Sequence, residues 1–123
     1  MPRLPHISII DDDDALRSSL ENLIRSVGLR VQGFSSAESF LSSHQAPETH
    51  CLILDVRMPG MSGPELQRQM AVANSHIPII FITAHEDDAQ RSQALEAGAV
   101  AFLHKPFYEE ELLNAIDAAV KES

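Results

Sequence analysis

The sequence predicts a doubly wound α/β fold, in which a five-stranded parallel sheet of strand order 2-1-3-4-5 is flanked by five helices. Short apolar runs alternate along the chain with segments whose apolar residues recur at spacings of three and four, the mark of an amphipathic helix. Three of the expected strands are apolar throughout, which indicates that both of their faces are buried. Helices placed between buried strands require right-handed crossovers, and therefore a parallel sheet.

The first strand and the first helix are expected on either side of a run of four aspartates. Residues 6–10 form a short β-branched run that stops at Asp11. After the aspartates, the apolar residues of 16–27 follow the helical spacing, and Gly28 comes next, where a helix end often takes the left-handed conformation. The following apolar run, 29–33, is expected to form the second strand.

A short helix and a buried strand are expected in the middle of the chain. Residues 35–38 can cap a helix that carries Phe40 and Leu41 inward. The apolar residues of 51–54 end at Asp55, and we expect them to form the third strand.

The remaining elements continue the alternation. Pro64 stands near the start of the third helix, because proline suits the first helical turn. The apolar runs 77–82 and 99–103 are expected to form the fourth and fifth strands, with a helix at 86–97 between them. Helical spacing returns in the tail, at Leu112, Leu113, Ile116, Ala119 and Val120.

Composition limits the functions that are open to the chain. Its 123 residues fit one domain, and 44% of them are hydrophobic, which is enough for a full core. The net charge of −9 argues against binding a nucleic-acid backbone, which needs a basic face. A single cysteine, Cys51, excludes an intrachain disulfide framework. Because there is no membrane-spanning run and no signal peptide, we expect a cytoplasmic protein with no membrane partner.

Polar residues stand at the ends of four expected strands. Asp11 and Asp12 follow the first strand, Asp55 the third, Thr83 the fourth and Lys105 the fifth. In an open parallel sheet, ligands bind outside the carboxyl ends of the strands, near the point where the strand order reverses. In the order 2-1-3-4-5 the first and third strands are neighbours, and the three carboxylates are therefore expected to converge.

This set of side chains suits phosphoryl chemistry that depends on a divalent cation. Three ionised carboxylates repel one another, and Mg²⁺ (or Mn²⁺) takes oxygen ligands of this kind. Lys105 can balance charge on the opposite side, and Thr83 adds a hydroxyl donor. The Asp55 carboxylate would then be the nucleophile that forms an acyl phosphate.

Each of these residues also has an ordinary structural explanation. Asp13 and Asp14 suit the N-terminus of the first helix, which favours side-chain caps and negative charge. Asp55 alone could open a turn, Thr83 alone could cap a helix, and an isolated lysine such as Lys105 is usually solvated. These explanations cover the features singly, but they do not account for their joint occurrence at successive strand ends.

Four segments carry a resemblance to a known family, namely 9–13, 52–63, 80–84 and 102–107. Together they resemble the receiver domain of bacterial two-component response regulators of the FixJ/NarL-like class. The resemblance extends from about residue 7 to the last helix. It implies a flavodoxin-like receiver domain over residues 1–123, with no output domain in this chain.

The resemblance assigns roles to the residues at the strand ends. It implies that Asp55 is the phosphoacceptor and takes its phosphoryl group from a sensor histidine kinase. Asp11, Asp12 and Asp55 would hold Mg²⁺, and the backbone carbonyl of Arg57 would complete the protein ligands. Asp12 is the expected direct ligand, with Asp11 acting partly through water.

Three further residues would respond to phosphorylation in a receiver of this kind. Thr83 would bind a phosphoryl oxygen and shift towards it. Lys105 would pair with the same group and, before phosphorylation, with Asp55. Phe102 occupies the aromatic switch position, where the ring turns inward as the hydroxyl moves. Phenylalanine there keeps the packing change without a phenolic hydrogen bond.

The resemblance also implies how the signal leaves the domain. The readout surface would be the face formed by the fourth helix, the fifth strand and the fifth helix. The expected fourth helix has only Leu95 as a large apolar residue, which favours mobility. We expect phosphorylation to promote a homodimer through this face. DNA binding would belong to a C-terminal output domain that residues 1–123 do not include.

Other function classes compete with this interpretation. A Mg²⁺-dependent aspartyl-phosphate phosphohydrolase would need a second acid two residues after its nucleophile, but position 57 is an arginine. We therefore expect no enzyme, and at most slow self-dephosphorylation. A flavin module would place phosphate where the aspartates of 11–14 repel it. A degenerate receiver is disfavoured because every expected functional side chain is present, and a stand-alone receiver is the alternative to one joined to an output domain.

Overall fold

The computed structural model describes residues 4–43 and 48–121, which form a five-stranded parallel sheet in the order β2-β1-β3-β4-β5. The predicted fold and strand order are confirmed. The strands are β1 (His6–Ile10), β2 (Arg30–Phe34), β3 (Cys51–Asp55), β4 (Ile79–Thr83) and β5 (Ala101–His104). The helices are α1 (Asp14–Ser26), α2 (Ala37–Ser42), α3 (Gly63–Val72), α4 (Asp88–Glu96) and α5 (Glu109–Lys121).

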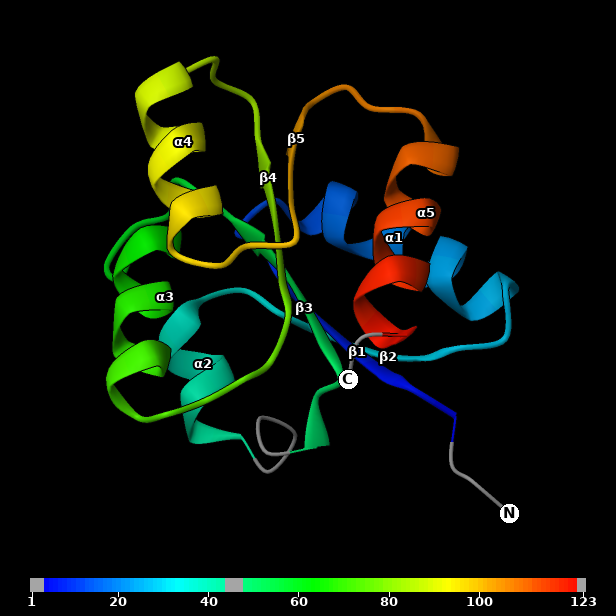
Figure 1. Ribbon diagram of the computed structural model, residues 1–123. Helices are drawn as coiled ribbons and strands as arrows, with labels where there is room; N and C mark the ends of the chain where they lie inside the picture. The colour runs from blue at the N-terminus through cyan, green and yellow to red at the C-terminus, as the bar shows by residue number, and fades with distance from the viewer. Residues whose placement is uncertain (1–3, 44–47, 122–123) are drawn as a thin grey trace.

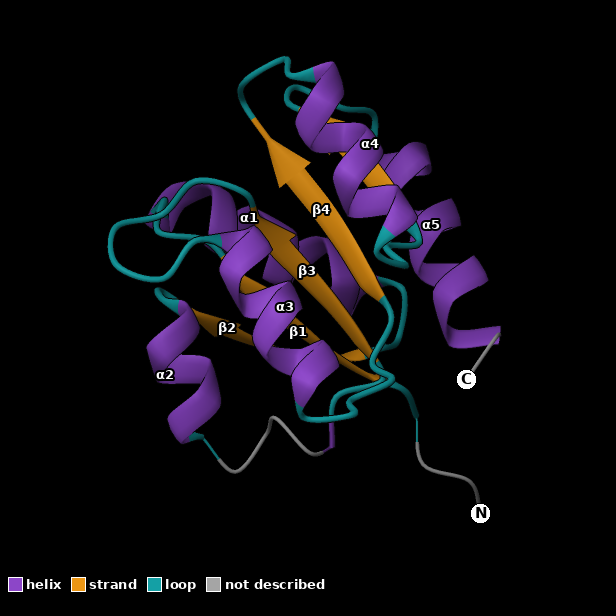
Figure 2. Cartoon of the chain, turned by 60° about the vertical axis from the view of Figure 1, so that its left-hand side comes forward, coloured by secondary structure: helices purple, strands orange, loops and turns teal. Residues whose placement is uncertain are grey.

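The sheet lies between two layers of helices. Figure 1 shows α1 and α5 on one face and α2, α3 and α4 on the other. Each face has its own apolar core, because alternate residues of a strand point to opposite sides. Thus Ile53 of β3 packs towards α1 and α5, while Leu52 and Leu54 pack towards the other three helices. The turned view in Figure 2 shows α2, α3 and α4 covering their face of the sheet.

Burial follows the position of each strand in the sheet. The three central strands, β1, β3 and β4, are buried at every residue. β5 is apolar in sequence but lies at the edge, where its residues are partly exposed. It also starts two residues later than expected, because the N–H of Ala99 donates instead to the carbonyl of Ala94 in α4, at 3.0 Å. β4 starts only after Pro78, which has no N–H for the sheet.

The helix ends lie where the sequence predicts them, but two apolar side chains are more exposed than their spacing in the sequence suggests. Ser36 caps α2 through its side chain, and Gly28 after α1 has the left-handed φ of 87°. Phe40 is buried as expected. Leu41 was expected to face inward and is instead 37% exposed, and Val27, the last residue of the predicted helical spacing, is 48% exposed. α2 is too short to bury more than one stripe, and Val27 lies beyond the last turn of α1.

The helix α3 begins directly beside the end of β3. Ser62 and Glu65 form a reciprocal capping box, with Pro64 in the first turn. The N–H of Gly63 donates to the carbonyl of Val56 at 3.0 Å. A Cβ atom on Gly63 would lie 2.5 Å from the carbonyl oxygen of Asp55 and 2.9 Å from the ring of Phe81. Only glycine allows the helix to begin this close to the strand.

Among the described residues, none of the helices has both the length and the apolar character that a membrane span requires.

We expect Gly63→Ala to lower the free energy of unfolding by about 1–3 kcal/mol, because the new methyl group overpacks a site bounded by backbone. Urea denaturation measures this change. Gln69→Ala, an exposed change in the same helix, is the matched control and should stay within about 0.5 kcal/mol of the wild type. Equal stability of Gly63→Ala and the wild type would contradict the close approach of α3 to β3.

Candidate functional site

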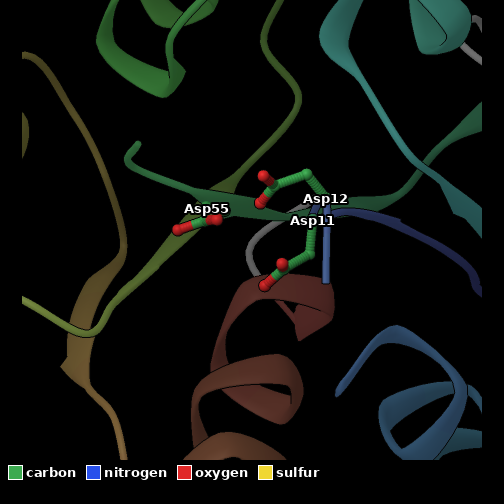
Figure 3. Close-up of side chains that lie close together, drawn as sticks. All are labelled: Asp11, Asp12 and Asp55. Carbon is green, nitrogen blue, oxygen red and sulfur yellow. The ribbon is translucent and has the colours of Figure 1, made fainter. Parts of the chain in front are cut away.

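Three carboxylates meet at the carboxyl ends of β1 and β3. One oxygen from each of Asp11, Asp12 and Asp55 lies within 4.8 Å of the others, and Figure 3 shows the three side chains. Asp11 and Asp55 are buried, whereas Asp12 is exposed. The convergence expected from the strand order is present in the structure. It arises because β1 and β3 are parallel neighbours and therefore end at the same edge of the sheet.

The Asp11 carboxylate accepts a hydrogen bond at each of its two oxygens. Its side chain is fully buried. One carboxylate oxygen accepts the N–H of Asp13 at 2.9 Å, and the other accepts the ammonium of Lys105 at 3.0 Å. Asp13 in turn caps α1 by accepting the N–H of Leu16 at 3.1 Å. The ordinary explanation of Asp13 as a helix cap is therefore correct, and it leaves Asp11 and Asp12 for the pocket.

Lys105 lies between two of the carboxylates. Its Nζ atom is 3.0 Å from Asp11 Oδ2 and 3.8 Å from Asp55 Oδ1. The pairing with Asp55 that the family resemblance implied is present as an ion pair, and the nearer carboxylate is that of Asp11. The backbone N–H of Lys105 donates to the carbonyl of Thr83 at 2.7 Å, which ties the loop after β5 to the end of β4.

Thr83 and Phe102 lie on the face of the sheet that α4 covers. Thr83 is buried, and its hydroxyl oxygen accepts the N–H of His85 at 3.1 Å. Phe81 shares a face of β4 with Thr83, and its ring lies against that of Phe102 with centroids 6.0 Å apart. Phe102 is half-buried in this packing. The hydroxyl and the two rings therefore belong to one patch on this face.

The Arg57 peptide adjoins Asp55, although the Arg57 side chain is exposed. The backbone N–H of Arg57 donates to the Asp55 carboxylate. This contact brings the loop after β3 to the edge of the carboxylate pocket. The role of the Arg57 carbonyl as a metal ligand stays a prediction.

Burial and charge strongly perturb Asp55. Its burial, together with the negative charges of Asp11 and Asp12, raises the pKa of Asp55 to about 7. Lys105 and the N–H of Arg57 act in the opposite direction but do not cancel the increase. Without a further cation, Asp55 is thus not fully ionised at neutral pH.

The donor set fits a hard divalent cation. It consists of three carboxylates, and oxygen ligands of this type are those that Mg²⁺ and Mn²⁺ prefer over nitrogen or sulfur. The exposed carboxylate of Asp12 leaves an open side through which the cation and its waters could enter. A bound cation would also favour the ionised form of Asp55.

One residue near the site escaped the sequence pattern. Arg17 lies on α1, and its guanidinium donates to the backbone carbonyl of Asp11 at 2.7 Å and to the carboxylate of Asp14 at 2.6 Å. The available signals were an arginine six residues after Asp11 and a glycine, Gly33, in the adjacent strand. Neither signal points to the pocket until the register of β1 and β2 is known.

In metal-free protein, we expect Asp55→Asn to increase stability near pH 8 but not near pH 4. The pKa of about 7 in the folded state lies above the ordinary value of 3.8, and so the unfolded state ionises first as the pH rises. The stability associated with the neutral carboxyl is complete below pH 3.8 and is lost as the pH rises through about 7. The asparagine cannot ionise and keeps that stability.

Urea denaturation with a chelator across this pH range measures the difference. Asp117→Asn is the control, because Asp117 is exposed and pairs with the exposed Lys121 on α5. Parallel stability profiles for Asp55→Asn and the wild type would contradict the perturbed state of Asp55.

Comparisons with known proteins agree with this geometry. The family model of the response regulator receiver domain matches residues 7–117. Nodulation protein W of Bradyrhizobium diazoefficiens is 50% identical over 94% of this chain, and response regulator protein TodT of Pseudomonas putida is 53% identical over 94%. The transcriptional regulatory protein FixJ of B. diazoefficiens is 40% identical over 96% of the chain.

The chain spans about half the length of these relatives, with 51% of nodulation protein W and of TodT covered and 58% of FixJ. Among solved structures, the response regulator StyR matches with a TM-score of 0.89 and 48% identity, over 98% of this chain and 61% of that one. The FixJ-N structure matches with a TM-score of 0.88 and 36% identity, over 99% and 98%. The family inferred from the sequence motifs is confirmed, and the chain belongs to the receiver domains of two-component response regulators.

Proposed function

We propose that Asp55 accepts a phosphoryl group from a sensor histidine kinase, in a reaction that depends on Mg²⁺ or Mn²⁺. The observation that carries the proposal is the buried Asp55 carboxylate, which shares its pocket with two more aspartates and with the ammonium of Lys105. A receiver domain works as a phosphoacceptor switch, and Asp55 is the carboxylate with the strongest perturbation in the described part of the chain.

The proposed transfer is a nucleophilic substitution at phosphorus. An ionised oxygen of Asp55 forms the new P–O bond while the P–N bond to the kinase histidine breaks, and the electron pair leaves with the imidazole. The product is an acyl phosphate. Mg²⁺ bound at such a site neutralises negative charge on the transferring group. Asp11, Asp12, Asp55 and the carbonyl of Arg57 are the proposed protein ligands.

Lys105 and Thr83 are the proposed donors to the phosphoryl oxygens. Lys105 already lies 3.8 Å from Asp55, and its closer contact with Asp11 can be exchanged for one with the new group. The Thr83 hydroxyl accepts the N–H of His85, which leaves its own proton free to donate. A shift of Thr83 towards Asp55 would open space beside Phe81, and the ring of Phe102 lies against that side chain.

The proposed output surface is the face formed by α4, β5 and α5. Only Ala94 is buried in α4, and this weak anchoring suits an element that moves. β5 is an exposed sheet edge, which favours pairing between two copies. We propose that phosphorylation promotes a homodimer here. Because the match covers 51% of TodT and 58% of the transcriptional regulatory protein FixJ, we further propose a DNA-binding output domain outside these residues.

A groove beside the pocket is the proposed contact for the kinase. It has a volume of about 600 Å³ and lies between α1 and the loop after β5. Leu16, Leu20, Leu23 and Phe107 line it, and Lys105 belongs to both the groove and the pocket. A kinase element seated there would reach Asp55 without crossing the sheet. Such an exchange is proposed to take place in the cytoplasm, where the kinase presents its phosphohistidine.

We propose a switch and not an enzyme with external substrates. Position 57, where a phosphohydrolase places its second acid, holds an exposed arginine whose peptide N–H contacts Asp55. In the part of the chain that the structure describes, this position thus offers no second acid to protonate a leaving alcohol. Slow self-hydrolysis of the acyl phosphate is the expected residual reaction.

Acetyl phosphate with Mg²⁺ should add one phosphoryl group to the wild type and none to Asp55→Asn. Intact-protein mass spectrometry, followed by peptide mapping, measures the product. Asp117→Asn should be modified like the wild type, because this residue is exposed on α5. A phosphoryl group on any other aspartate, or modification in the presence of a chelator, would contradict the proposed acceptor or its dependence on a cation.

Beryllofluoride with Mg²⁺ should convert the wild type from monomer to dimer, because the mimic recruits Thr83 and Lys105 as a phosphoryl group would. Sedimentation velocity measures the change. Lys105→Ala should take up a phosphoryl group from acetyl phosphate but fail to dimerise, since it lacks the charged donor. A monomeric wild type under saturating mimic, or an unimpaired Lys105→Ala dimer, would reject this mechanism of signal output.

A further inference from the structure

The end of β1 is held by a side chain from the following helix. Nη1 of Arg17 donates to the backbone carbonyl of Asp11 at 2.7 Å, and Nη2 donates to Asp14 Oδ1 at 2.6 Å. The Arg17 side chain is 18% exposed, whereas that of Asp14 is 86% exposed. The contact with Asp14 is therefore a solvated surface pair of small energetic value, and the contact with Asp11 is the more protected one.

The Asp11 carbonyl needs such a donor. The N–H of Asp11 still pairs with the carbonyl of Phe34 in β2, but the chain then leaves the sheet to enter α1. Asp11 is fully buried, and a buried carbonyl without a partner costs free energy. The guanidinium supplies a charge-assisted hydrogen bond, which is stronger than a neutral one.

A glycine in the neighbouring strand makes room for this arrangement. Gly33 of β2 is the register partner of Ile9 in β1. A Cβ atom on Gly33 would lie 2.9 Å from Cγ and 3.0 Å from Cδ of Arg17. The stem of Arg17 thus crosses β2 where there is no side chain, and its head reaches the turn that follows β1. Figure 1 shows α1 leading directly into β2, beside β1.

We infer that Arg17 is a positioning residue for the metal ligands, an inference that rests on the proposed function. By fixing the Asp11 carbonyl, it sets the turn from which the Asp11 and Asp12 carboxylates project. Asp11 has further contacts through Asp13 and Lys105, but the exposed Asp12 depends on the course of the turn. Arg17 donates to the backbone carbonyl of Asp11 and not to its carboxylate. It therefore holds the backbone from which the ligands extend.

Arg17 can affect Mg²⁺ binding through its charge or through the position of the turn, and the two effects predict different changes in Mg²⁺ affinity when Arg17 is removed. Arg17 is a cation on the helix that follows the pocket, and by Coulomb's law alone its removal would leave Mg²⁺ binding unchanged or make it tighter. If Arg17 positions the turn, its removal weakens Mg²⁺ binding instead. Changes to residues that orient metal ligands typically lower affinity by about 10- to 100-fold.

The experiment measures the Mg²⁺ dissociation constant by isothermal titration calorimetry, with the Asp12 amide signal followed by NMR. Arg17→Ala should bind Mg²⁺ about 10-fold more weakly than the wild type. Arg17→Lys keeps the charge but loses the two-pronged donor, and it should also bind more weakly. Arg25→Ala, which removes an exposed arginine from the same helix, is the matched control and should bind like the wild type. Unchanged or tighter binding by Arg17→Ala would overturn the inference.

Gly33→Ala tests the same geometry without changing any charge. Its methyl group displaces the Arg17 stem, and so it should weaken Mg²⁺ binding as Arg17→Ala does. In the double variant, the methyl group meets Cδ of Glu21 at 3.0 Å, the end of a flexible side chain that can move aside, and we expect no further loss beyond that of Arg17→Ala. Fully multiplicative losses would reject a shared mechanism. Urea denaturation confirms that each variant is folded under the conditions of the titration.

The outcome for the wild type separates the two proposals. A wild type that binds no Mg²⁺ and takes no phosphoryl group from acetyl phosphate would refute the proposed function, and with it the role of Arg17. A wild type that does both, alongside an Arg17→Ala variant with unaltered affinity and an unaltered Asp12 amide signal, would refute the role of Arg17 alone.

Discussion

Mutual repulsion among Asp11, Asp12 and Asp55 is the constraint around which the rest of the pocket is organised. The parallel sheet places their oxygens within 4.8 Å of one another, and two of the three side chains are buried. Lys105 offsets part of this charge from the far side, yet the pKa of Asp55 still rises to about 7. The pocket is thus short of positive charge, which suits the proposed binding of a cation and the proposed exchange of contacts on phosphorylation.

The two faces of the sheet have different parts in this organisation. The face under α1 and α5 has a continuous core of aliphatic side chains from three strands and both helices. The opposite face contains Phe81 and Phe102, and it is covered at β5 only by the weakly buried α4. Thr83 shares this second face with Phe81. A displacement of Thr83 would therefore act on the part of this face beside α4, where only Ala94 of the helix is buried.

Most of the fold could be predicted from the sequence, because buried strands and the caps of helices leave local patterns. The apolar run 51–54 and the serine at position 36 are of this kind. Exposure of Leu41 could not be predicted, since helical spacing gives a stripe without saying how wide the covering surface is. The convergence of the aspartates could be predicted from the strand order. Which carboxylate lies nearer to Lys105 could not be predicted, because Asp11 and Asp55 stand at the ends of adjacent strands. The packing of Arg17 over Gly33 depends on a register between β1 and β2 that no local pattern encodes.

The close approach of Gly63 to the main chain of Asp55 limits how a modified Asp55 side chain could be accommodated. The main chain of Asp55 is enclosed by the start of α3 on one side and by the hydrogen bond from the Val56 N–H to the Ile82 carbonyl on the other. New charge on the carboxylate would therefore not be relieved by retreat of the strand that carries it. Asp55 would then keep its position, and the proposed adjustment would fall on the side chains and loops around it.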